Sequence, residues 1–99
     1  MIDDRNIPAV PVHPGEILSK EFLEPMDLTQ TALADHLGVP VRRINEICRG
    51  RRAVSAETAW LLAQALGTSP QFWLNLQALY ELAVAKSEGR IHKVAAIST

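Results

Sequence analysis

The sequence predicts an all-α fold of five helices, and three observations lead to this prediction. Residues that favour helix N-termini precede several apolar stretches, and glycine or proline closes them. Between these boundaries the apolar residues recur at helical spacing. Strand-like alternation is weak and confined to residues 91–94, which leaves room there for a short terminal strand.

Proline, threonine and glycine delimit the first two helices. Pro14 suits a first helical position, and Pro25 ends that helix because it cannot continue the backbone hydrogen bonds. Thr29 is a good N-cap for a second helix that reaches about Leu37, and Gly38 makes a sharp exit. The inward residues expected on these helices are Ile17, Leu18 and Phe22, and then Ala32 or Leu33, with Ala34 and Leu37.

Three further helices follow the same signals. The third spans about residues 40–49 and is followed by Gly50. Ser55 caps a fourth helix that Gly67 stops, and Ser69 followed by proline opens a fifth helix that runs to about Lys86. The stripes expected to be buried are Ala59, Trp60, Ala63 and Leu66 on the fourth helix, and Phe72, Trp73, Leu76, Leu79, Tyr80 and Ala83 on the fifth.

These elements divide the chain into three parts. Residues 1–12 contain two prolines and read as a flexible N-terminal segment. Residues 13–86 form a single helical domain, because 99 residues with 47% hydrophobic content suffice for one packed core. Residues 87–99 read as a short C-terminal tail that is first basic and then small and apolar.

The charge distribution says more than the net charge of −1. Residues 1–41 hold seven acids and two bases, whereas residues 42–52 hold five arginines and a single acid. A basic stripe on an otherwise acidic body is typical of nucleic-acid binding. A solvated arginine-rich surface loop is the alternative interpretation of the same stripe.

Other functional classes find little support in the sequence. Cys48 has no partner for an internal disulfide and is expected to be a buried structural thiol. The histidines lie far apart, and no metal-ligand spacing, phosphate loop or acid–base pair stands out, so we expect no metal, no cofactor and no enzymatic activity. No signal peptide or membrane span is visible, which favours a soluble, cytoplasmic protein.

The third helix has two chemically distinct faces when its residues are placed on a helical wheel. Val41, Ile44, Ile47 and Cys48 fall on one side, which is expected to face the core. Arg42, Glu46 and Arg49 fall on the opposite side, with Arg43 and Asn45 on the flanks. The polar side therefore offers two arginines and an asparagine to a single groove.

This polar face suits the edges of DNA bases. Arginine can bind guanine O6 and N7 with two hydrogen bonds, and asparagine can do the same with adenine N6 and N7. Arg51 and Arg52 follow the helix and are expected to contact phosphate. Gln30, in the first turn of the second helix, is expected near the DNA backbone. For Glu46 we expect an intrahelical ion pair with Arg42 or with Arg49 rather than a contact with DNA.

The chain also resembles a known family. The sequences Thr29-Gln30, Leu33-Ala34 and Leu37-Gly38-Val39, with Ile44 and Gly50, are similar to the lambda-repressor-like (Cro/C1, XRE) helix-turn-helix. The wider pattern, which runs from His13-Pro14-Gly15-Glu16 through Phe22-Leu23-Glu24-Pro25 to Ala65–Gln77, resembles the HigA-type antitoxins over about residues 12–82. One departure is Pro40, which stands where relatives usually have a serine cap.

The resemblance implies properties that composition does not reveal. It implies a five-helix lambda-repressor-like domain that dimerises and represses its own operon by binding a palindromic operator in double-stranded DNA. It also implies a partner, a HigB-type toxin, which is a RelE-like ribonuclease that cleaves translated mRNA. The positions that match operator contacts are Gln30, Val41, Arg42, Arg43 and Asn45, with Arg49 and Arg51 nearby.

The fifth helix predicts the homodimer interface. Leu74 and Leu82 fall well outside its apolar stripe, and a helix that is apolar beyond one face needs a second surface to cover it. A second copy of the chain supplies that surface and matches paired half-sites in DNA. The alternative is that these are scattered surface leucines. Trp60, Phe72 and Trp73 are expected to be core aromatics.

The sequence thus predicts a dimeric DNA-binding autorepressor that acts as the antitoxin of a HigB-type toxin. A stand-alone repressor without a toxin partner is one alternative. Another is a protein-interaction module in which the acidic first 41 residues face a basic partner.

Overall fold

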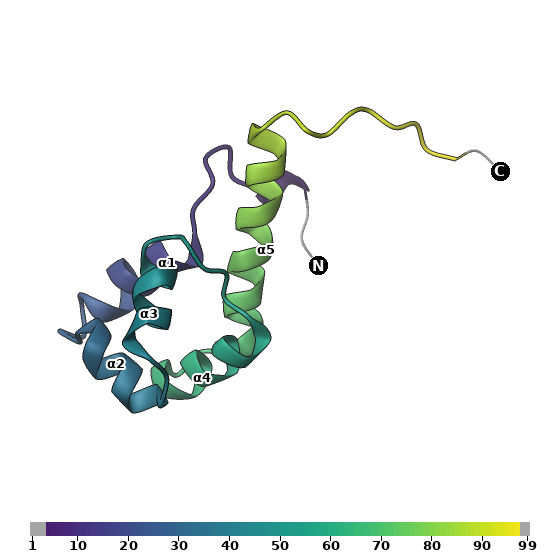
Figure 1. The fold of residues 1–99 in the computed structure, drawn as a ribbon. Helices are drawn as coiled ribbons and strands as arrows, with labels where there is room; N and C mark the ends of the chain where they lie inside the picture. The colour runs from purple at the N-terminus through teal and green to yellow at the C-terminus, as the bar shows by residue number, and fades with distance from the viewer. Residues whose placement is uncertain (1–3, 98–99) are drawn as a thin grey trace.

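Five α-helices and their connections form the described part of the chain, residues 4–97, in this computed structural model (Figure 1). The helices are α1 (Pro14–Ile17), α2 (Gln30–Leu37), α3 (Val41–Cys48), α4 (Ala56–Leu66) and α5 (Pro70–Ser87). Within residues 4–97 there is no strand, so the all-α prediction is confirmed. Residues 91–94, where the sequence left room for a short strand, have no regular structure.

The first helix changes its winding soon after it begins. His13 caps α1 by accepting a hydrogen bond from the backbone N–H of Gly15 at its Nδ1 atom, over 2.9 Å. The helix then continues as a π-helical segment, η2 (Leu18–Leu23), in which the N–H of Glu24 donates to the carbonyl of Ser19. It ends before Pro25, as the sequence predicts.

Helices α2 and α3 are joined by a tight turn. The Thr29 hydroxyl caps α2 by accepting the N–H of Ala32 at 3.0 Å. Gly38 adopts a left-handed conformation with φ of 74°, which a side chain would disfavour, and so turns the chain sharply. Pro40 then precedes α3 in an extended conformation and gives it no side-chain cap.

The backbone of α1 at Gly15 lies in close contact with the backbone of α3 at Ile47. A Cβ atom on Gly15 would lie 1.7 Å from the carbonyl oxygen of Ile47, far inside van der Waals contact. Only glycine fits this position without moving one helix. The side chain of Ile47 is fully buried, so the contact also closes the core at that point.

The core lies between η2, α2, α3, α4 and the first half of α5. Its largest member, Trp73, is fully buried and donates a 2.7 Å hydrogen bond from its indole N–H to the Thr68 hydroxyl. The buried apolar cluster consists of Leu18, Leu23, Leu33, Ala34, Ile44, Ile47, Val54, Ala59, Leu62 and Trp73. One buried polar side chain connects two elements: the Oε1 atom of Gln77 on α5 accepts the N–H of Val54 at 2.9 Å.

Several burial expectations are wrong or only partly right. Trp60 is 61% exposed on the outside of α4, and Leu62 takes the buried place instead. Val41, the first residue of α3, is 46% exposed although it was expected to face the core. Phe72 is 36% exposed but still packs edge-on against the ring of Trp73, with the ring centroids 5.0 Å apart.

The far half of α5 projects from the bundle, the N-terminal segment passes beside it, and the tail that follows α5 extends away from the helix (Figure 1). The N-terminal segment is not wholly irregular, since it includes a 3-10 turn, η1 (Asp4–Asn6). The tail from residue 91 to residue 97 is exposed throughout. Residues 1–3 and 98–99, which the sequence assigned to the flexible segment and the tail, lie outside the described residues. None of the helices among the described residues is long and apolar enough to span a membrane.

Candidate nucleic-acid interface

Helix α3 separates its apolar and charged residues onto opposite sides. Ile44 and Ile47 are fully buried, whereas the side chain of Arg42 is 83% exposed and Arg49 is also exposed. The division predicted by the helical wheel is therefore confirmed for these four residues. Val41, expected inside, joins the exposed side instead, where it lies beside Arg42 at the start of the helix.

The start of α2 is tied to the middle of α3 by a pair of amides. The Nδ2 atom of Asn45 donates to the Oε1 atom of Gln30 over 3.2 Å. This bond uses one amide hydrogen of Asn45 and leaves its oxygen, together with the amide hydrogens of Gln30, for a ligand. The two side chains predicted to reach DNA thus lie side by side and are joined by a hydrogen bond.

Arg43 is turned away from the other arginines of the helix. Its Nη1 atom lies 3.0 Å from the Oε1 atom of Glu57 at the start of α4, and its side chain is only 28% exposed. The structure therefore does not bring Arg43 together with Arg42 and Arg49. Its place between two helices suits the positioning of α3 at least as well as a contact with DNA.

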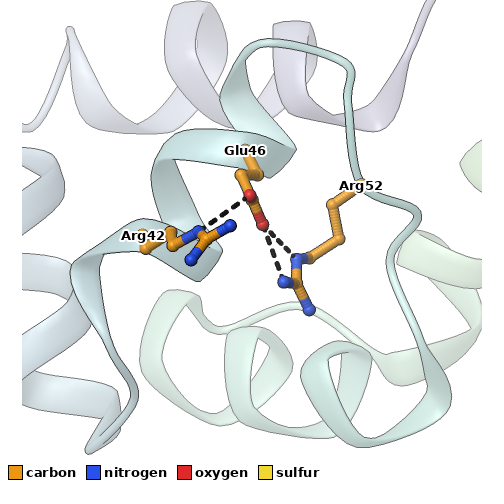
Figure 2. Close-up of polar contacts among 3 residues, drawn as sticks. All are labelled: Arg42, Glu46 and Arg52. Atoms are coloured by element: carbon orange, nitrogen blue, oxygen red, sulfur yellow. Dashed lines mark hydrogen bonds and ion pairs between the residues drawn. The ribbon is translucent and has the colours of Figure 1, made fainter.

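A carboxylate joins Arg42 to Arg52 across the polar face (Figure 2). The Oε2 atom of Glu46 lies 3.1 Å from the Nε atom of Arg42, and its Oε1 atom lies 2.8 Å from Nε and 2.7 Å from Nη2 of Arg52. These hydrogen bonds, first from Arg52 and then from Arg42, lower the pKa of the Glu46 carboxyl. The expected pair of Glu46 with Arg42 is confirmed.

The contact of Arg52 with Glu46 was not predicted from the sequence. Arg52 lies six residues further along, beyond the helix, and no helical spacing brings it back to Glu46. The return is made by Gly50, whose φ is 73°, and by the N–H of Arg51, which donates to the carbonyl of Glu46 at 2.8 Å. The only signal in the sequence was the glycine after the helix, which predicts a reversal but not its direction.

The loop after α3 is also held from the N-terminal side. Burial lowers the pKa of His13, while a hydrogen bond to the backbone of Arg52 raises it by a smaller amount. The same imidazole caps α1 and stacks edge-on with Tyr80 of α5, with the ring centroids 4.8 Å apart. His13 therefore connects α1, α5 and the loop that carries Arg51 and Arg52.

The chain has one cysteine, Cys48. Cys48, which was expected to be buried, is only half-buried; burial raises the pKa of its thiol, and a hydrogen bond with Ser19 lowers that pKa by less. Among residues 4–97 no three histidine, cysteine or acidic side chains gather as a metal site would require.

The exposed side of α5 includes two leucines. Leu74 is 38% exposed and Leu82 is 43% exposed, as expected for residues outside the buried stripe. Leu82 also lines an apolar hollow of about 440 Å³ at the far end of the helix. The other residues that line this hollow are Ile7, Ala85, Lys86, Gly89 and Ile91.

Comparisons with known proteins place the chain in a family. A family model described as "Helix-turn-helix" matches residues 20–73, which include α2, the turn and α3. The chain is 47% identical over 77 residues to virulence-associated protein I of Dichelobacter nodosus, a match that covers 78% of this chain and 71% of the relative. It is 44% identical over 72 residues to antitoxin HigA-1 of Vibrio cholerae serotype O1, covering 73% and 68%.

A solved structure shows the same arrangement of helices. It is described as Pseudomonas aeruginosa antitoxin HigA with higBA promoter, and it superimposes with a TM-score of 0.77 at 44% identity. The alignment covers 82% of this chain and 89% of that one. The chain belongs to the helix-turn-helix family. Within that family its similarity is to HigA antitoxins, so the resemblance found in the sequence is confirmed.

Proposed function

We propose that this protein is a dimeric, sequence-specific DNA-binding autorepressor and the antitoxin of a HigB-type toxin. The observation that carries the proposal is the exposed face of α3. It presents Arg42 and Arg49 on a helix whose opposite side is anchored in the core by Ile44 and Ile47. A short helix held in this way fits the major groove, where guanidinium groups bind guanine or phosphate.

The hydrogen-bonded amides of Gln30 and Asn45 support the recognition of DNA bases in addition to electrostatic attraction to the DNA backbone. The oxygen of one amide and the hydrogens of the other match the donor and acceptor pattern of an adenine edge. Arg51 and Arg52 lie on the loop just beyond α3, where contacts with phosphate set the register of the helix on the duplex. The solved relative that contains promoter DNA supports the same mode of binding.

Dimerisation is proposed through α5. Leu74 and Leu82 lie on its exposed side, and a helix face that presents leucines to water is stabilised when a second copy covers it. Two copies related by a two-fold axis place two α3 helices at paired half-sites, which is how helix-turn-helix dimers bind palindromes.

The toxin partner rests on the relatives, two of which are described as HigA antitoxins. Neutralisation is expected to use a surface other than the exposed face of α3, so that DNA and toxin can be bound by one protein. The acidic residues of the first 41 positions offer a potential complementary to a basic ribonuclease.

A binding assay tests the DNA-binding half of the proposal. The DNA that precedes the coding sequence is cut into overlapping duplexes, and each is titrated against an unrelated duplex of equal length. We expect at least one upstream duplex to bind about 1000-fold more tightly than the unrelated one at physiological salt. Equal binding to all duplexes would contradict sequence-specific repression.

A growth assay tests the antitoxin half. The reading frame beside this gene is expressed from an inducible promoter, with and without this protein. We expect arrest of growth by the neighbour alone and rescue by co-expression. A harmless neighbour, or an arrest that this protein does not relieve, would leave a repressor without the proposed toxin. A protein-interaction module that lacks a DNA target would instead show binding to the partner but no preference among duplexes.

A further inference from the structure

Glu46 is an acidic side chain in the middle of a surface that otherwise attracts DNA. It lies on the polar side of α3 between two arginines, and residues 42–52 contain no other acid. Its side chain is 24% exposed, so its carboxylate is partly shielded by the guanidinium groups around it. A negative charge at this place opposes the approach of phosphate, so its presence calls for a physical reason.

Stability does not supply that reason. Ion pairs between exposed side chains contribute little to folding, since their attraction is screened and two long side chains must be ordered. Here Arg42 is 83% exposed and Arg52 is 47% exposed. The arrangement therefore has more consequence for where the two guanidinium groups are held than for the free energy of unfolding.

The hydrogen bonds leave the outer ends of both arginines available. An arginine has five N–H donors: one at Nε and two on each Nη atom. The contact of Arg42 with Glu46 is made from Nε, which leaves the four N–H donors of its two Nη atoms for other acceptors. Arg52 contacts Glu46 through Nε and Nη2, which leaves its Nη1 side for another acceptor.

We propose that Glu46 is a specificity-determining residue of the DNA interface, which acts by positioning Arg42 and Arg52. This inference rests on the proposed DNA-binding function. The carboxylate fixes the direction in which each guanidinium group points its remaining N–H donors. Both guanidinium groups can then form hydrogen bonds only with acceptors at two defined places on the duplex. Its charge also partly neutralises the arginines, which weakens their attraction to phosphates in general.

The fixed direction of the donors and the reduced charge together favour a specific DNA sequence over DNA of any other sequence. Without the carboxylate, each arginine rotates to the nearest phosphate of any sequence, because attraction to phosphate needs no defined geometry. When the carboxylate is present, a phosphate that does not lie opposite the remaining donors can bind an arginine only if the hydrogen bond of that arginine to Glu46 breaks. If that bond stays, the phosphate is repelled by the carboxylate. The carboxylate therefore lowers the affinity for non-specific DNA. It does not lower the affinity for a sequence whose base and phosphate acceptors lie opposite the fixed donors.

The substitution Glu46→Gln tests the proposal because it keeps the shape of the side chain and removes its charge. We expect the variant to bind an unrelated duplex about fivefold to tenfold more tightly at about 0.1 M salt, as one additional phosphate contact would predict. The plot of log affinity against log salt should become steeper by up to about one. The ratio of affinities for the upstream duplex and the unrelated duplex should fall about tenfold.

A matched control removes the same charge elsewhere. Glu88→Gln breaks the ion pair with Arg90, in which Nε lies 2.8 Å from Oε1, beyond the far end of α5. It changes the net charge by the same amount as Glu46→Gln, and we expect its affinities, salt slope and specificity ratio to match those of the wild type. Thermal unfolding of both variants checks that each folds as the wild type does.

A second variant tests whether Glu46 acts through Arg52. In an Arg52→Gln background, Glu46→Gln should change the specificity ratio much less than it does alone. A drop in affinity for both duplexes by the same factor, with an unchanged salt slope, would show a merely structural role and overturn the proposal. So would a specificity ratio equal to that of the wild type. If the wild type itself prefers no upstream duplex, the proposed function fails first and the role of Glu46 falls with it.

Discussion

The exposed sides of α3 and α5 differ in their most prominent residues, although both helices are anchored by buried apolar residues. The outer face of α3 carries Arg42 and Arg49, whereas the outer face of α5 carries Leu74 and Leu82. A polyanion can stabilise the first surface, and a second apolar surface can stabilise the other. Under the proposed function, DNA and a second copy of the chain therefore bind to different helices of one small domain.

The N-termini of α3 and α5 also differ, because a side chain caps only that of α5. The Ser69 hydroxyl caps α5 by accepting the N–H of Phe72, whereas α3 begins at Pro40 with no side-chain cap. The first N–H groups of α3 are therefore free of a competing side chain and close to Arg42. An uncapped N-terminus is more favourable beside a phosphate than beside hydrocarbon, which again fits α3 to DNA and α5 to a protein.

The largest expected effect comes from disturbing the support of α3. Gly15→Ala would place a methyl group against the backbone of Ile47, and we expect a loss of at least about 3 kcal/mol in the free energy of unfolding. Chemical denaturation measures this loss. Gly38→Ala is the control: its Cβ meets open space, so the only cost is that of a left-handed alanine, about 1 kcal/mol. Equal losses would show that α1 does not brace α3.

The next largest effect concerns the charge on α3. Arg42→Ala combined with Arg49→Ala should weaken binding to the upstream duplex by about 100-fold, because two guanidinium contacts are removed. Fluorescence anisotropy gives the affinities, and sedimentation shows whether self-association is unchanged. Arg90→Ala combined with Lys93→Ala removes the same charge from the tail and should leave binding nearly intact. A similar loss of affinity in both double variants would show that DNA is held by general electrostatic attraction and not by the face of α3.

A smaller effect is expected from charging the outer face of α5. Leu82→Glu places a carboxylate where we expect a second copy to pack, and it should weaken self-association by about tenfold or more. Sedimentation equilibrium measures this constant. Val94→Glu, which makes the same kind of change at a residue of the tail that is 75% exposed, should have no such effect. Unchanged association of Leu82→Glu would place the dimer interface elsewhere.

The smallest effect is a dependence of stability on pH. Because burial lowers the pKa of His13 below its unfolded value of 6.5, folding favours the neutral ring. Its contribution is complete above pH 6.5 and is lost as the pH falls from there through the folded pKa. Denaturation at pH 7.5 and at lower pH should show a loss in the wild type that is smaller in His13→Asn, which keeps a capping side chain but does not titrate. Parallel losses in both proteins would contradict this role.

Much of the fold could be predicted because local signals and packing agree. Thr29, Ser55 and Ser69 each cap the helix that they were expected to cap, and Gly38 and Gly67 each end one in a left-handed conformation. The buried residues of α3 also follow from its helical periodicity. In these places the residue with the right local chemistry is also the residue that the tertiary structure requires.

The errors arise where neighbours that are distant in sequence decide the outcome. Trp60 has the apolar character of a core residue, but α4 turns that side to solvent and buries Leu62. Gln77 looks like a surface residue, yet it is buried because the N–H of Val54 needs an acceptor. Arg52 reaches Glu46 only through the reversal after α3. None of these contacts follows from helical spacing, since each depends on how separate elements meet.

The central claim is that the outer face of α3 binds DNA, and an NMR titration tests it most directly. Amide resonances of the uniformly labelled protein are followed as the best upstream duplex is added. We predict that the largest changes occur at Gln30 and at residues 41–52, with little change at Leu74 and Leu82. Changes that are concentrated on α5 or in the acidic N-terminal part, with residues 41–52 unmoved, would contradict it.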